Sequence, residues 1–442
     1  MNKPPQLLDD ARMQEFIRNG YITVQTDLSA EFHSDLRQRI EEVFTTEGNP
    51  GNNVLPRVPA IQQVLDDPSV HGALQSILGP DYYPHPHRHC HFNPPGSEGQ
   101  KMHKDSWSKR HHRTRWAMAF YYPQDTPVNL GPTGIVPGSQ YHNSTPEGDL
   151  SGEVPLTGQA GSVVLVHYDL WHRAMPNHSD QKRYMVKFLF TRLDEPSGPT
   201  WNTSGASWPA TDDSRTAIWQ NMWTWHGGAA SPPSNGGDIE ALRDTREALS
   251  LASAYHLDKR SIPALIDLLG DDDEAVRRNA GYALTALDAS AVPALIEACA
   301  DPHEPRRAQA ADALGDIGTT AASAAPALIG MLSDASVTSR RNAIDALGVT
   351  GGEDIATALA PCLSDDDEWT CRNAALALLR LGPDAAPVQN SIVAALASEN
   401  RYVSAKAAQT LKRLGTQTAQ QALLDYLFTA RWCPKTSAAS SF

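Results

Sequence analysis

The spacing of apolar positions changes near residue 240 and divides the chain into two parts. Residues 9–44 hold two segments with apolar side chains at helical spacing, on either side of the short stretch "YITVQ". From residue 82 onward, short alternating runs such as "RWAMAFYYP", "GSVVLVHYDLWH" and "RYMVKFLFTRL" are separated by Gly and Pro. This pattern predicts helices followed by the strands of a β-barrel or jelly-roll sandwich.

The second part of the chain repeats. The stretch "VRRNAGYALTAL" returns as "PRRAQAADALGDIG", "SRRNAIDALGVTG", "TCRNAALALLRLG" and "VSAKAAQTLKRLG", each after a shorter apolar helix and an acidic turn. Taking Arg278, Arg307, Arg341 and Arg372 as markers, the spacings are 29, 34 and 31 residues. Two-helix repeats of this length stack into a solenoid that shares one core. They resemble the HEAT-like family.

These patterns predict a multidomain protein. We expect a double-stranded β-helix (a jelly-roll or cupin-like barrel) with flanking helices, followed by an all-α HEAT-like solenoid. The barrel domain should cover residues 1–226, including a Trp-rich connecting segment. The stretch "GGAASPPSNGGD" places a linker at 227–237. The solenoid should then cover residues 238–428, with a C-terminal tail at 429–442.

The composition of the chain disfavours some classes of binding partner. A net charge of -14 over 442 residues disfavours binding to nucleic acid or to a membrane surface, because phosphate contact needs a basic face. No apolar run approaches the roughly 20 residues that span a bilayer, and the start "MNKPPQLLDD" lacks the apolar stretch of a secretion signal. The five scattered cysteines fit reduced thiols in the cytoplasm, where we expect the protein to be located.

Three residues in the strand-rich part suggest a metal site. His103 and Asp105 form a His-x-Asp pair, whose side chains share one face of a strand, and His172 ends a later strand. Two imidazoles and one carboxylate form the facial triad of non-haem Fe(II) oxygenases, which leaves coordination positions open. Arg183, on the next strand, carries a planar fork suited to a carboxylate.

The order "MHKDSW", "GPTGIVPGSQYH" and "GSVVLVHYDLWHRAMPNHSDQKRY" resembles the phytanoyl-CoA dioxygenase family over about residues 8–195. The resemblance implies that the triad holds Fe(II), with 2-oxoglutarate and O2 as cosubstrates. It implies that Arg183 pairs with the far carboxylate of 2-oxoglutarate, and that Asn177 and Thr133 lie at the cosubstrate site. Gln140 stands where the family usually has histidine, and Gly161 is followed by Ser where an Asp is usual.

The activity implied by the resemblance is oxidation of a C–H bond with release of succinate and CO2. We expect hydroxylation of an anionic small molecule, with desaturation or cyclisation left open. An aspartate at position 105 argues against the halogenating relatives, which leave that place empty for chloride. Two alternatives remain: oxidation of a protein recruited by the solenoid, or a non-catalytic HEAT-type interaction protein. Retention of the whole triad and Arg183 argues against the second.

Histidines occupy every second position of "HPHRHCHF" at residues 85–92. On a strand they share one face, with neighbours roughly 7 Å apart, too far for consecutive pairs to close a compact tetrahedral metal site. We therefore expect this strand to line the pocket, with His89 and His91 contacting substrate. A polar strand with hydrogen-bonded or solvated imidazoles is the alternative.

The stretch "KDSWSKRHHRTRW" is basic within an acidic protein. Because it follows the His-x-Asp pair, we expect it at the mouth of the site, where Arg113 would attract an anionic substrate. The alternative is a loop that pairs with acids of the solenoid. Trp107, Phe120 and Tyr122 are further candidates for the substrate wall, although aromatic residues at such positions also build cores.

Overall fold

The computed structural model describes residues 3–105, 112–143, 152–229, 236–244 and 247–429. The chain forms two compact units, Met1–Ile317 and Gly318–Phe442. Each unit is described by itself. No helix in the described part of the chain is both long enough and apolar enough to cross a membrane.

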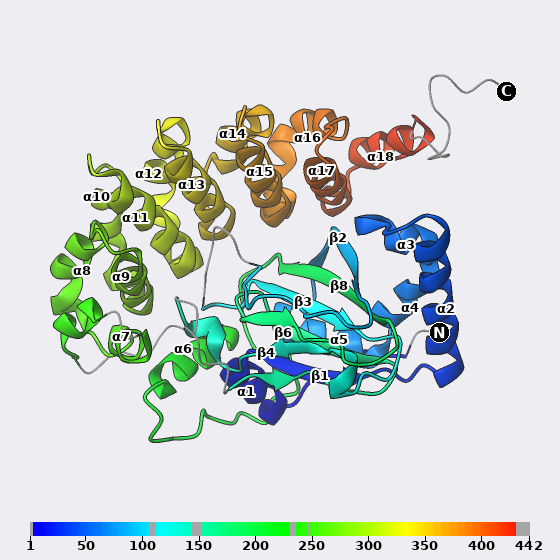
Figure 1. Cartoon of the computed structure of the whole chain (residues 1–442). Coiled ribbons are helices and arrows are strands. Elements are labelled where there is room, and N and C mark those ends of the chain that lie inside the picture. The colour runs from blue at the N-terminus through cyan, green and yellow to red at the C-terminus, as the bar shows by residue number, and fades with distance from the viewer. Residues whose placement is uncertain (1–2, 106–111, 144–151, 230–235, 245–246, 430–442) are drawn as a thin grey trace. The chain divides into compact units, whose positions relative to one another are not determined.

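The first unit contains two antiparallel sheets (Figure 1). The larger has the order β1-β6-β3-β8-β2, formed by Tyr21–Gln25, Ser162–His167, Trp116–Tyr121, Arg183–Arg192 and Tyr82–Asn93. The smaller has the order β5-β4-β7, formed by Val154–Pro155, Thr133–Ile135 and His172–Ala174. The expected antiparallel strands are confirmed. The described strands do not close into the expected barrel, because hydrogen bonding in the larger sheet ends at β1 and β2.

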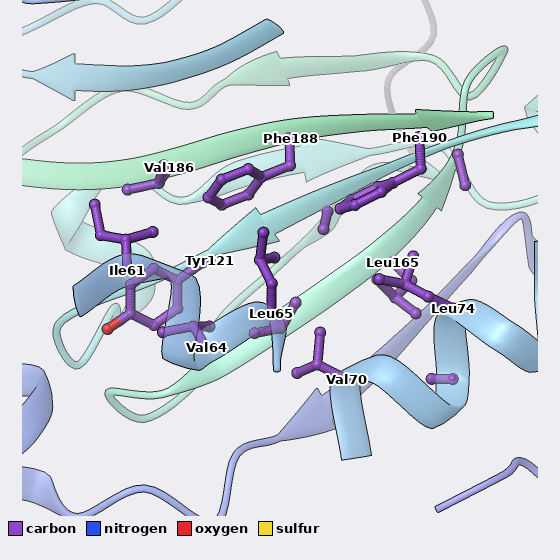
Figure 2. Packing of buried hydrophobic residues seen from close by; sticks show 14 of the residues in the cluster. Ile61, Val64, Leu65, Val70, Leu74, Tyr121, Leu165, Val186, Phe188 and Phe190 are labelled. Carbon is purple, nitrogen blue, oxygen red and sulfur yellow. The ribbon is translucent and has the colours of Figure 1, made fainter. Parts of the chain in front are cut away.

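Helices cover one face of the larger sheet. They are α1 (Asp10–Asn19), α2 (Ala30–Thr46), α3 (Val54–Arg57), α4 (Gln62–Leu65) and α5 (Pro68–Leu78). Alternation along β8 separates the two faces of the sheet: Tyr184, Val186, Phe188 and Phe190 pack among these helices, as Figure 2 shows for the last three. Met185 belongs instead to the apolar cluster on the opposite face. This second face is the one turned toward the candidate site.

The repeats begin inside the first unit. After α6 (Thr216–His226) come α7 (Glu247–Ala254), α8 (Ile262–Leu268), α9 (Glu274–Ala286), α10 (Val292–Ala298) and α11 (Glu304–Ile317). The second unit continues with α12 (Ala325–Gly330), α13 (Val337–Thr350), α14 (Ile355–Leu359), α15 (Glu368–Leu381), α16 (Gln389–Ala395), α17 (Arg401–Leu414) and α18 (Gln417–Thr429). The expected helical repeats are confirmed.

One arginine in each of three successive repeats makes the same contact within its own repeat. Arg277, Arg307 and Arg340 each donate to carbonyls five and six residues earlier, in the turn before the helix. In the fourth repeat the Cys371 thiol donates to the carbonyl of Asp365 instead. These positions are 30, 33 and 31 residues apart. The repeated arginines therefore close the turns of their own repeats.

The described end of the basic stretch, residues 112–116, packs against the first repeats within the first unit. Arg113 is buried and donates to the carbonyls of Asp316 and Ile317 at the end of α11. Arg115 binds the Asp316 carboxylate at 3.0 Å and forms a two-pronged pair with Glu195. A helix C-terminus presents unpaired carbonyls and partial negative charge, which these guanidinium groups satisfy. The expected exposed position of Arg113 at the pocket mouth is contradicted, and the alternative of pairing with the solenoid accounts for it.

Neighbouring aromatic rings complete this contact. The His112 ring stacks on Tyr282 with centroids 3.7 Å apart, and its Nδ1 lies 2.6 Å from the Tyr255 hydroxyl. The linker at 227–237 remains our proposed boundary between the two kinds of fold. The compact unit nevertheless extends to Ile317, because these buried contacts join the first repeats to the sheets.

We predict that Arg113→Met lowers the free energy of unfolding by about 2–4 kcal/mol, because it removes a buried charge-assisted contact and leaves the carbonyl of Ile317 at the end of α11 without this donor. Denaturant unfolding of the full chain measures this change. Arg260→Met is the matched control, since the Arg260 side chain is 82% exposed. Equal stability of the Arg113 and Arg260 variants would contradict this role of Arg113.

Candidate metal centre

Backbone pairing brings the two ligand histidines together. His103 and His172 form an isolated antiparallel bridge, with N–H to carbonyl distances of 3.0 and 2.9 Å in the two directions. Their ring centroids are 4.6 Å apart. Each Nδ1 lies within 3.0 Å of a carbonyl two residues earlier, that of Lys101 or Leu170. A carbonyl can only accept, so Nδ1 carries the proton and Nε2 is left to bind a metal.

Asp105 completes the group. Its Oδ1 is 3.9 Å from His103 Nε2, and its Oδ2 is 3.5 Å from His172 Nε2. All three ligand atoms lie within 4.8 Å of one another, the arrangement expected of donors around one ion. Among the described residues, no other group of histidine, cysteine and carboxylate side chains meets this condition.

Lys187 is a member of the site that the sequence analysis missed. Its Nζ lies 2.7 Å from Asp105 Oδ2, and its side chain is 9% exposed. Burial raises the pKa of Asp105, but the contacts with His172 and with the charged Lys187 outweigh it and hold the pKa well below its usual range. Alternation along β8 could have identified Lys187, because residues 183, 185 and 187 share a face.

A cavity opens beside the two histidines of the triad. It lies between the sheets, and its lining includes Thr133 from β4, His172 from β7, Phe120 from β3, His91 from β2, and Arg183, Met185 and Lys187 from β8. His103, His172 and Arg183 therefore open to one space, as the resemblance implies for metal and cosubstrate, and Asp105 contacts Lys187 of the lining.

Arg183 has the environment of an anion-binding residue. It is 1% exposed, and its Nε donates to the carbonyl of Gly131 at 3.0 Å. Its Nη1 is buried without a hydrogen-bond partner, and among the described residues no carboxylate forms an ion pair with it. Gly131 has φ of 68°, and a Cβ there would meet Asn93 Nδ2 at 2.5 Å, so glycine is needed for this close approach. A buried guanidinium with a free donor suits a carboxylate ligand.

The predicted substrate residues on β2 and β3 lie near this space. His91 lines the cavity, and its Nε2 is buried without a partner. Burial, with help from the charge on Lys187, lowers the pKa of His91 to about 2, so its ring is neutral. The His89 ring is 4.8 Å from that of His91. Phe120 lines the cavity 5.7 Å from the His172 ring. Trp107 lies outside the described residues.

The remaining candidates support the cavity in different ways. The Tyr122 hydroxyl donates to Thr133 Oγ1 at 2.9 Å, so it orients a residue of the lining. Asn177 instead closes the turn between β7 and β8. Its amide donates to the carbonyls of Asn93 and Gln181, and its oxygen accepts from Ser179. The Asn177 side chain is thus engaged within the turn.

The histidine-rich strand is less regular than its sequence. β2 shifts register between Pro84 and Arg88, which interrupts the alternation. His85 is buried and stacks on Trp116 with centroids 4.6 Å apart. His89 and His91 follow the irregularity and face the site side, whereas Cys90 packs in the core under the helices.

Comparison with known proteins agrees with this arrangement. Residues 16–185 match the family described as phytanoyl-CoA dioxygenase, and residues 240–315 and 292–380 match HEAT repeats.

Similar solved structures include the non-haem α-ketoglutarate-dependent carbocyclase SnoK from nogalamycin biosynthesis, at 21% identity over 43% of this chain and 88% of that chain, with a TM-score of 0.36. EctD from S. alaskensis with 2-oxoglutarate and 5-hydroxyectoine is 18% identical over 44% of this chain and 78% of that chain, with a TM-score of 0.37. AviO1 from Streptomyces viridochromogenes Tue57 is 16% identical over 44% of this chain and 99% of that chain, with a TM-score of 0.35.

The matched segment contains the triad and reaches Arg183. Its donor set of two imidazoles and one carboxylate fits iron, and the unpartnered Arg183 guanidinium fits the carboxylate of 2-oxoglutarate. Residues 16–185 thus match the phytanoyl-CoA dioxygenase family and carry side chains that fit iron and 2-oxoglutarate, and a match to HEAT repeats follows in the chain.

Proposed function

We propose that this protein hydroxylates an unactivated C–H bond of an anionic small molecule, with release of succinate and CO2. The observation that carries the proposal is the shared cavity: the two histidines of the triad and an unpartnered buried Arg183 donor open to one space, and Asp105 completes the group of candidate ligands beside it. When bound, Fe(II) with 2-oxoglutarate and O2 supplies the oxidising chemistry.

The chain's own residues bind the metal and orient the cosubstrate. His103 and His172 present Nε2, because carbonyls hold their Nδ1 protons, and Asp105 presents an ionised carboxylate. Arg183 binds the far carboxylate of 2-oxoglutarate beside Thr133. Arg183 and Lys187 lie four residues apart on β8, about 13 Å along the strand. A cosubstrate anchored at Arg183 therefore extends toward the triad.

The rest of the cavity favours an anionic, partly apolar substrate. Phe120 and Met185 supply apolar walls, and neutral His91 offers a free ring nitrogen for hydrogen bonding. Arg173 and Lys187 add cationic side chains to the lining, although Arg173 pairs with Glu153 and Lys187 with Asp105. The cationic lining of the cavity therefore supports an anionic substrate. Arg113, which was expected to attract the substrate, is instead buried in packing against α11.

Two broader expectations accompany this proposal. We propose that the two sheets are halves of a double-stranded β-helix, because the site lies between them and the His103–His172 bridge continues the smaller sheet. We also propose a cytoplasmic location, which the four free cysteines of the described chain support.

We predict that His172→Ala abolishes 2-oxoglutarate-dependent succinate formation, because two ligands cannot hold Fe(II) in the open geometry of the triad. Succinate is measured with the purified protein, Fe(II), 2-oxoglutarate and candidate acids in air. His178→Ala is the matched control, since His178 is exposed and lies six residues further on. Unchanged succinate formation in His172→Ala would exclude the proposed function.

We predict that Arg183→Met weakens 2-oxoglutarate binding about 10- to 100-fold, because a charge-assisted hydrogen bond contributes roughly 1.5–3 kcal/mol. Anaerobic calorimetric titration of the metal-loaded protein measures the change. Arg183→Lys keeps the positive charge without the planar guanidinium, so its affinity for 2-oxoglutarate should lie between those of the wild type and Arg183→Met. Wild-type affinity in Arg183→Met would place the cosubstrate carboxylate elsewhere.

A protein substrate recruited by the repeats is the second candidate, favoured by the HEAT match. In the second unit, Trp369 is 43% exposed, and the Arg372 guanidinium lies 4.7 Å from its ring. Aromatic and arginine side chains of this kind are common in protein interfaces.

Removal of residues 318–442 separates the two candidates, since the first compact unit ends at Ile317. For a small-molecule substrate, we predict that kcat/KM changes less than about threefold, well below the tenfold that 1.4 kcal/mol represents. Mass spectrometry of the oxidised product measures the rate, and circular dichroism checks the fold. Loss of turnover with a folded first unit would favour recruitment.

A further inference from the structure

We propose that Lys187 is a positioning residue for the metal: its ammonium group holds the Asp105 carboxylate in place and thereby strengthens Fe(II) binding by the triad. This inference rests on the proposed function, because it concerns the same metal centre. It assigns a role to the one cation that contacts a triad carboxylate in the described part of the chain.

The three ligands are held in different ways. His103 and His172 are fixed by their mutual backbone bridge. Asp105 lies in a bend outside every strand, so no sheet pairing fixes it. Outside the triad, two side chains contact it, the Lys187 ammonium at 2.7 Å from Oδ2 and the Tyr168 hydroxyl at 3.1 Å from its carbonyl oxygen. Of these two, Lys187 contacts the carboxylate, whose Oδ2 also lies 3.5 Å from His172 Nε2.

Lys187 is well placed to act as a fixed support. It lies on β8, which pairs on both sides, with His89 of β2 and Phe120 of β3 opposite Lys187. The residue is 7% exposed, so its side chain has few alternative positions. On the same face, Arg183 reaches the cosubstrate end of the cavity. One strand thus positions both the cosubstrate anchor and the metal carboxylate.

The contact also selects an oxygen. Lys187 binds Oδ2, which leaves Oδ1 beside His103 Nε2 as the oxygen available to a metal. Binding through one oxygen keeps further coordination positions open, as the facial triad requires. Ligating carboxylates are commonly oriented by such an outer hydrogen bond, and its loss typically costs about 10- to 100-fold in metal affinity.

An opposing electrostatic effect predicts the opposite change in metal affinity, so the direction of the measured change decides between the two. An ammonium group near the site also repels a divalent cation and competes with it for Asp105. If competition dominated, removing Lys187 would tighten metal binding. If positioning dominates, as we infer, removing it weakens metal binding.

The test measures metal affinity directly. Full-length Lys187→Met is titrated anaerobically with Fe(II), and in parallel with Mn(II), by calorimetry and by the Mn(II) paramagnetic resonance signal. We expect dissociation constants about 10- to 100-fold larger than for the wild type. Lys187→Arg, which keeps the charge and a donor, should restore most of the affinity. Lys182→Met is the matched control, because Lys182 pairs with Glu41 away from the site.

Unchanged or tighter metal binding in Lys187→Met would overturn the inference. If that variant does not fold, Lys187→Gln carries the test, since it keeps a donor without the charge; wild-type or tighter affinity in Lys187→Gln would equally overturn it. The proposed function fails separately if the wild type binds Fe(II) and Lys187→Met binds it less tightly, but no succinate forms. A wild type that binds neither metal would overturn both.

Discussion

The two-sided alternation of β8 is the constraint on which the rest of the first unit depends. Because successive side chains point to opposite faces, the same strand contributes Val186 and Phe188 to the core under the helices and Arg183 and Lys187 to the cavity. A shift of one residue would exchange these faces and place charges in the core. Pairing with β2 and β3 on both sides fixes the register. Stability of the core and geometry of the site are thus specified together.

The residues that the sequence identified correctly are those whose motif also determines their local geometry. His103 and Asp105 could be paired from their spacing, and the order of motifs added His172, which the structure brings within ligand distance. Lys187 could not be assigned in the same way, because its partner lies 82 positions away in the chain. Alternation showed which face Lys187 occupies but not which acid it meets. The register shift in β2 was equally hidden, since regular spacing of histidines says nothing about a bulge.

Contacts between residues far apart in the chain also explain why the position of the basic stretch could not be predicted from its sequence. Its sequence shows several cations close to a metal motif, and both an open pocket mouth and a packed contact are compatible with that pattern. The deciding feature is the C-terminus of α11, about 200 positions later, whose carbonyls accept from Arg113. The change in composition near residue 240 predicts where strands give way to repeats. It does not mark where compact packing ends, because the surface that α11 presents to Arg113 and Arg115 arises only in the folded chain.

This packing changes how the repeats should be viewed. Asp105 and Arg115 lie ten positions apart; Asp105 belongs to the candidate metal centre and contacts Lys187, and Arg115 is bonded to Asp316 in the last helix of the first unit. In the second unit, by contrast, Arg341 pairs with Asp367 and Arg413 with the carbonyl of Leu379, so these arginines join repeat to repeat. The first repeats accordingly act as part of the oxygenase framework, and a recruiting surface has to be sought in the second unit.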